Sequence, residues 1–177
     1  MKRMLIMVAI AALTVSMSFG QFTKGTKSVS SLFSYQSMNS GEDGDDGTSV
    51  LSIEPAGSYF FMDNIAADVT IDMTTTSMGD IDNKTSLMAF GATYYMNNMY
   101  GGLGFAMASS TMGDADAFKS NAIAIKAGYL HSMVENWYFD IGLRYNMGMG
   151  KYKMGSEEGP DNKSSSMTLG LGVVTFF

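Results

Sequence analysis

Six charged side chains have the clearest capacity for chemistry in this chain. Each lies in a stretch where the residues two positions away are mostly Gly, Ala, Ser, Thr or Asn. Four are carboxylates and two are bases, and if they share a confined space, unpaired charge there would be costly, so pairing is expected. The six are Glu54, Asp68, Asp72, Lys126, Asp140 and Arg144.

The chain has few residues from which other kinds of site could be built. The chain has one histidine, His131, and no cysteine, so hydrolytic triads and zinc sites lack their residues. The pairs Gly102-x-Gly104 and Gly170-x-Gly172 fall inside strand-like stretches, which argues against a dinucleotide-binding turn. We therefore predict no catalytic residue, no metal and no cofactor. A third hypothesis is an enzyme that uses carboxylates and serines, but no arrangement of these residues in the sequence supports it.

The stretch 137–149 shows which kind of element carries these charges. Its odd positions, from Trp137 to Met149, are all large and apolar, whereas its even positions are mostly polar or tiny. A strand points successive side chains to opposite faces, so this alternation predicts one apolar and one polar face. The run is long enough to cross a bilayer as a tilted strand. Asp140 and Arg144 lie on its polar face.

The amino terminus has the layout of a secretory signal peptide. Lys2 and Arg3 precede an apolar run, and the small residues Ser18 and Gly20 come before Gln21. We predict cleavage after Gly20, which leaves a single domain over residues 21–177. The run is too short for a membrane anchor, so any entry into a membrane must use strands. Loss of Lys2 and Arg3 changes the net charge from −6 to −8, which argues against a nucleic-acid partner.

The turns divide the chain into eight strands of period two. Three short connections turn on Asn or Asp, at Asp63-Asn64, Asn97-Asn98 and Asn136, where left-handed backbone geometry is tolerated. Four longer connections lie between them, near 39–48, 77–84, 111–120 and 152–164. Alternation of short and long turns places both chain ends on the short-turn side.

The polar face is predicted to be the inner one. In a soluble barrel the polar face would be exposed to water, yet this face carries only the six charges. Its other residues are mostly small, and a narrow eight-stranded interior can hold small residues. Large aromatic residues also gather on the apolar face at the short-turn end, as in a membrane-interface girdle. They are Tyr59, Tyr94, Tyr129, Trp137 and Phe139. The predicted fold is all-β, an eight-stranded antiparallel up-and-down transmembrane β-barrel.

With this layout the chain resembles the small eight-stranded outer-membrane barrels of bacteria, of the OmpA, OmpX and OmpW type without a further domain. The last strand supports the resemblance, because outward residues alternate to a terminal aromatic residue, through Leu171, Val173, Thr175 and Phe177. In the family that pattern is the signal read by the barrel-assembly machinery. The resemblance implies a bacterial outer membrane, periplasmic termini, and lipid and lipopolysaccharide as surroundings.

Two readings of the charged interior follow. One is a structural polar plug, which we favour because eight strands leave little free bore. The other is a gated, narrow ion path in which a salt bridge changes partners, as similar barrels suggest. At the level of function, the first corresponds to a structural or surface-interaction role, such as envelope integrity, adhesion or binding of an extracellular ligand through acidic outer loops. The second corresponds to a channel or conduit for ions or small hydrophobic solutes.

Overall fold

The structure is a computed structural model, and it describes residues 22–38, 48–78, 81–112, 118–154 and 157–177. The predicted signal peptide and the acidic segment 41–47 lie outside these ranges. Nearly all described residues are in strands, and no helix among them is long and apolar enough to cross a bilayer. The strands are β1 (Lys27–Met38), β2 (Thr48–Met62), β3 (Ile65–Met78), β4 (Ile81–Met96), β5 (Met99–Met112), β6 (Phe118–Val134), β7 (Trp137–Met154), β8 (Glu157–Asp161) and β9 (Ser165–Phe176).

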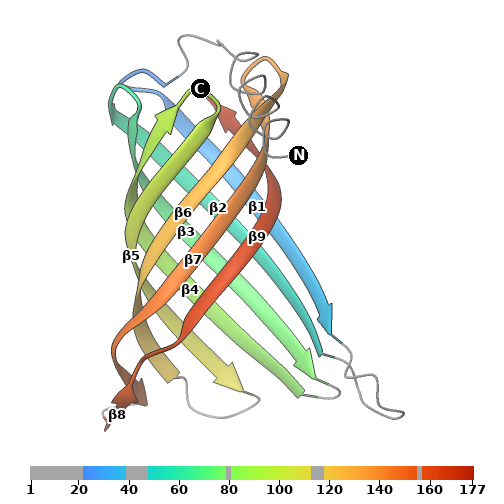
Figure 1. The fold of residues 1–177 in the computed structure, drawn as a ribbon, viewed down its shortest axis with the longest axis vertical. Helices are drawn as coiled ribbons and strands as arrows, with labels where there is room; N and C mark the ends of the chain where they lie inside the picture. Colours follow the sequence, from blue (N-terminus) through green and yellow to red (C-terminus); the bar gives the residue numbers. More distant parts are fainter. Residues whose placement is uncertain (1–21, 39–47, 79–80, 113–117, 155–156) are drawn as a thin grey trace, which may run out of the picture.

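Eight of these strands form a closed antiparallel barrel. Consecutive strands pair from β1 to β7, β9 then pairs with β7, and β1 pairs with β9 to close the sheet. The strands run obliquely around the barrel, with both ends of the described chain at the same rim (Figure 1). The predicted fold class is therefore confirmed. Closure matters because it pairs most of the backbone donors and acceptors that would otherwise be exposed to lipid at a sheet edge.

The connections at the two rims differ in part from the prediction. The short turns are confirmed: Asn64, Asn97 and Asn136 adopt φ values of 64°, 55° and 64°, which asparagine tolerates better than most residues. The connection predicted near 39–48 agrees with the strand ends, but two others are shorter than predicted: β3 continues to Met78 and β4 begins at Ile81, and β5 continues to Met112 and β6 begins at Phe118. The predicted loop 152–164 contains a ninth, short strand, β8, which pairs with the end of β7. The backbone hydrogen bonds between these strands thus continue beyond the residues in which apolar and polar side chains alternate.

The alternation of faces is as predicted. Outward side chains such as Leu103, Leu143 and Leu169 expose 64%, 39% and 65% of their surface, and we interpret this face as the lipid-facing one. Inward neighbours such as Ser52, Glu54 and Asp140 are buried. A soluble protein would not present a continuous apolar face around its circumference. The physical reason for the split is the two-residue period of the strand.

The seam between β1 and β9 closes over only part of its length. Its ladder runs from the pair Ser28 and Phe176 to the pair Phe33 and Leu171. Within the described residues, β1 then continues to Met38 and β9 reaches back to Ser165 without further pairs between them. The two strands diverge toward the rim with the long connections (Figure 1). Among the eight barrel strands, in the described ranges, this is the longest stretch of unpaired strand edge.

Candidate functional site in the barrel lumen

The six predicted charges all point into the lumen, and four of them form two ion pairs. Lys126 Nζ lies 3.0 Å from Asp68 Oδ2, and Arg144 Nε lies 2.8 Å from Glu54 Oε1. Both acids are buried, and each pair joins strands that are not neighbours in the sheet: β6 with β3, and β7 with β2. The ion pairs therefore cross the lumen and occupy it.

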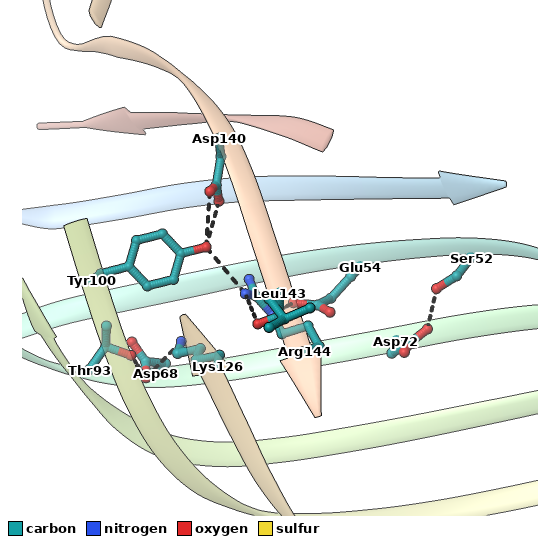
Figure 2. A network of polar contacts seen from close by, with 10 residues as sticks. All are labelled: Ser52, Glu54, Asp68, Asp72, Thr93, Tyr100, Lys126, Asp140, Leu143 and Arg144. Carbon is teal, nitrogen blue, oxygen red and sulfur yellow. Dashed lines mark hydrogen bonds and ion pairs between the residues drawn. The ribbon is translucent and has the colours of Figure 1, made fainter. Parts of the chain in front are cut away.

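The remaining two acids are held by hydroxyl groups. The Tyr100 hydroxyl donates to Asp140 at 2.9 Å and accepts from Arg144 Nη1 at 3.2 Å, so it links Asp140 to the arginine pair. Asp72 accepts from Ser52 at 2.6 Å and from Thr74 at 2.9 Å. Figure 2 shows Tyr100 between Asp140 and Arg144, and the contact between Ser52 and Asp72 apart from them. We call Glu54, Asp68, Asp72, Tyr100, Lys126, Asp140 and Arg144 the lumen network.

One oxygen of the network has no protein partner. Asp68 Oδ2 accepts from Thr93 at 2.8 Å and meets Lys126, but Asp68 Oδ1 is buried without a hydrogen bond among the described residues. Asp68 lines a cavity of about 40 Å³, and a water needs only about 10–15 Å³. A buried carboxylate oxygen is costly to leave unpaired, so this cavity is the natural place for a bridging water.

Glycine makes room for the large side chains of the network. A Cβ at Gly142 would lie 3.0 Å from both Arg144 Nη1 and the Tyr100 hydroxyl oxygen. At Gly128 the added atom would collide with the Tyr100 ring. The small residues predicted to fill the narrow interior thus leave the space that Tyr100 and Arg144 use. Tyr100 was not among the predicted site residues, although its inward parity on β5 was available as a signal.

The lumen at the short-turn end is filled by aromatic side chains, which were not predicted there. We call this group the aromatic plug. Phe60 is fully buried, and its ring lies 5.0 Å from that of Tyr95. Phe22, in the segment before β1, packs 4.9 Å from Tyr95 and 5.3 Å from Phe176 between ring centroids. The plug comprises Phe22, Phe60, Ala66, Tyr95, Tyr100, Leu130, Tyr138, Val174 and Phe176.

The prediction that small residues dominate the inner face is therefore wrong at this end. The missed signal is simple: each short turn is flanked by aromatic residues of both parities, for example Tyr94 and Tyr95, or Trp137 and Tyr138. The predicted girdle uses the outward ones, and the plug uses the inward ones. At this rim Asn64 N donates to Phe22 O at 2.6 Å, which holds the segment before β1 against the plug.

The predicted girdle and carboxy-terminal residues lie on the outer face. Tyr59, Tyr94 and Trp137 are about half exposed, whereas Tyr129 and Phe139 are partly covered. All five lie near the short-turn rim, on the strands that flank the short turns. Leu171, Val173 and Phe177 are exposed and Thr175 is partly covered, so the four alternate along the outer face of β9 and the residue after it. His131 is exposed on the same wall and takes no part in the lumen network.

Beyond the network, toward the long connections, the lumen widens into a cavity of about 690 Å³, which we call the outer-end cavity. Its wall is formed by inward residues of β4 to β7, by residues of β8, by the segment after β8 and by the start of β9. Asn162 reaches into this end, where it donates to Asn121 O at 3.1 Å and accepts from the Ser164 hydroxyl at 2.6 Å. The cavities on the network side and at the plug are only about 40 and 20 Å³.

Comparisons with known proteins agree with this architecture. No protein-family model matches the chain, and no curated protein matches it. Solved structures do match. Neisserial surface protein A is 17% identical with a TM-score of 0.55, over 85% of this chain and 94% of its own. Ail, the attachment invasion locus protein of Yersinia pestis, is 17% identical with a TM-score of 0.53, over 88% of this chain and 100% of its own.

A third similar structure is the outer membrane protein OprG of Pseudomonas aeruginosa. It is 16% identical with a TM-score of 0.51, and the match covers 88% of this chain and 97% of OprG. Identities this low concern the fold and leave the role open. The chain therefore has the eight-stranded barrel fold of small bacterial outer-membrane proteins, with a lumen filled by ion pairs and aromatic rings.

Proposed function

We propose that this chain is an integral protein of a bacterial outer membrane whose lumen is closed, and that it acts by supporting the envelope or by binding at its outer surface. In this proposal the termini and the short turns face the periplasm, and the long connections face outward. Removal of a signal peptide after Gly20 would precede insertion. No catalytic role is proposed.

The filled lumen is the observation that carries this proposal. Ion pairs from Lys126 and Arg144 cross the bore, and the aromatic plug fills the periplasmic end beneath them. The cavities left between these groups, about 40 and 20 Å³, hold one or a few waters each. A hydrated ion needs a continuous aqueous path, which such isolated spaces do not provide.

Single-channel recording in planar bilayers tests the closed lumen. We expect the refolded full chain to insert without discrete conductance steps, while a general porin in the same bilayer supplies the positive control. Insertion is verified separately by the heat-dependent gel mobility of the folded barrel. Reproducible conductance steps from the inserted protein would show that the lumen conducts ions. The channel hypothesis would then replace this proposal.

The competing function is a narrow channel or conduit for ions or small hydrophobic solutes. One observation favours it: Leu87 and Asn146 line both the outer-end cavity and the cavity beside the network. Rearrangement of the Arg144 and Lys126 pairs would still be needed to reach the periplasmic end. For that reason the closed barrel is the better-supported function.

The proposal also includes partners of assembly and residence. The outward residues of the last strand, ending at Phe177, are suited to recognition by the barrel-assembly machinery, as in the barrels that the chain resembles. The half-exposed aromatic side chains near the short turns suit the inner lipid interface. Lipid and lipopolysaccharide would then surround the apolar wall.

A further inference from the structure

We propose that the outer-end cavity is a binding site for a small uncharged ligand that carries both hydroxyl groups and an apolar face, as a neutral sugar does. This goes beyond the closed-barrel function. It needs a folded barrel but does not depend on whether ions pass. At about 690 Å³ the cavity falls in the size range of small-molecule sites, roughly 300–1,000 Å³.

The cavity differs in charge from the space directly beneath it. Among the described residues that line it, none is charged, although the cavity beside the network is lined by Glu54, Lys126 and Arg144. A charged ligand would lose its hydration in this cavity without meeting an opposite charge. The lining therefore favours a neutral molecule.

Several polar groups of the lining have unused hydrogen-bonding capacity. The side chains of Ser120, Asn146, Tyr152 and Ser166 line the cavity, and in the described part of the chain none has a hydrogen bond to another residue. Nearby Ser110 and Asn162, by contrast, are already bonded, to Asn83 and to Asn121. A carboxamide both donates and accepts, and a hydroxyl does the same. These groups match the hydroxyl groups of a sugar.

The lining also has an apolar part beside further hydroxyl groups such as those of Thr85 and Ser164. Phe118, Leu87, Ala108, Ala122 and Pro160 contribute the apolar part, together with the ring of Tyr152. A few placed polar groups on an apolar, aromatic wall are the usual composition of small-molecule sites. A purely aliphatic ligand would leave the Asn146 carboxamide and the hydroxyl groups unpaired as water is displaced, which is unfavourable. A molecule with one apolar face and several hydroxyl groups satisfies both parts of the wall.

Nuclear magnetic resonance of the refolded full chain in micelles of a phosphocholine detergent provides the test. We expect maltose to shift the side-chain amide signals of Asn146 in a saturable way. Gluconate, which has similar hydroxyl groups and a charge, and cyclohexane, which has no hydroxyl group, should shift them far less. Equal shifts with gluconate, shifts with cyclohexane alone, or no saturable shift with maltose would each overturn the proposal.

Two variants and a matched control complete the experiment. Asn146→Leu removes the carboxamide and should weaken maltose binding about three- to tenfold, followed through the backbone amide signals of β7. Tyr152→Phe, which removes only a hydroxyl group, should weaken it by a similar factor and serves if Asn146→Leu fails to fold. Asn121→Leu changes only an exposed side chain on β6 and keeps the backbone oxygen that Asn162 contacts, so this variant should bind as wild type does. Wild-type affinity in both cavity variants would show that maltose binds elsewhere.

Discussion

At the scale of single residues, Arg144 holds most of the lumen network together. Its guanidinium group contacts Glu54 through Nε and Tyr100 through Nη1, and it lies 5.7 Å from the centre of the Tyr100 ring. Through Tyr100 it also reaches Asp140. One side chain thus connects β7 to β2 and β5 across the lumen, so its contribution exceeds that of a surface ion pair.

We therefore expect Arg144→Ala to destabilise the folded barrel by about 3–5 kcal/mol, because it leaves the buried Glu54 carboxylate without its partner. Urea unfolding in lipid vesicles, followed by gel mobility, measures this free energy. The control Lys119→Ala removes an exposed base on β6 and should change stability by less than about 0.5 kcal/mol. Equal effects of the two substitutions would mean that the lumen is wider and wetter than described.

At the scale of elements, the seam between β1 and β9 is the least closed part of the wall. The outward residues Tyr35, Met167 and Leu169 on its unpaired stretch are exposed by 70%, 72% and 65%, among the highest values on the apolar face. They lack a neighbour across the seam, whereas outward residues in the paired ladders are flanked on both sides. Unpaired backbone groups are costly in lipid, so this stretch is expected to be the least stable of the barrel strands.

Hydrogen exchange in the folded barrel checks this expectation. All of β9 from Ser165 to Thr175 pairs with β7, but only Leu171 to Phe176 pairs with β1. Alternate amides of 166–170 point toward β1 and should exchange quickly, while the amides between them stay protected. The control is segment 171–176 of the same strand, where the amides that point toward β1 and those that point toward β7 should all be protected. Uniform protection along β9 would show that the seam is closed in the membrane.

At the scale of the whole molecule, the two rims have different structures. The short-turn rim is closed by the aromatic plug and by the segment before β1, where Lys24 N donates to Asp63 at 2.8 Å and Gly25 N donates to Phe60 O at 2.8 Å. The opposite rim carries the outer-end cavity and β8. In the proposed function, a small ligand would therefore enter from the hollow end only.

The proposed orientation predicts how a protease added to intact cells will act. We expect cleavage within the acidic connection 41–47, which would face outward, and none at Asp63-Asn64 or Asn97-Asn98, which would face the periplasm. Cleavage is located by mass spectrometry of the fragments. Disrupted cells provide the control for access to the periplasmic side. Cleavage restricted to the short turns in intact cells would invert the topology.

The sequence alone determined which side chains face the lumen and which face outward. That outcome is local, because a strand alternates its side chains with a period of two regardless of its neighbours. The same locality explains the asparagine turns at Asn64, Asn97 and Asn136. It also placed Glu54, Asp68, Asp72, Lys126, Asp140 and Arg144 on one face before any pairing was known.

Only the tertiary structure decided which of these residues meet. Arg144 and Glu54 are separated by 90 residues, and their pairing depends on how the strands are staggered when the sheet closes. The stagger also brings Phe60, Tyr95 and Phe176 together in the plug, where Phe22 from the segment before β1 packs against them. The sequence places aromatic residues beside the short turns, but which of their rings meet is set by the registers of all the ladders together. The outer-end cavity is likewise the part of the lumen that the network and the plug leave unfilled.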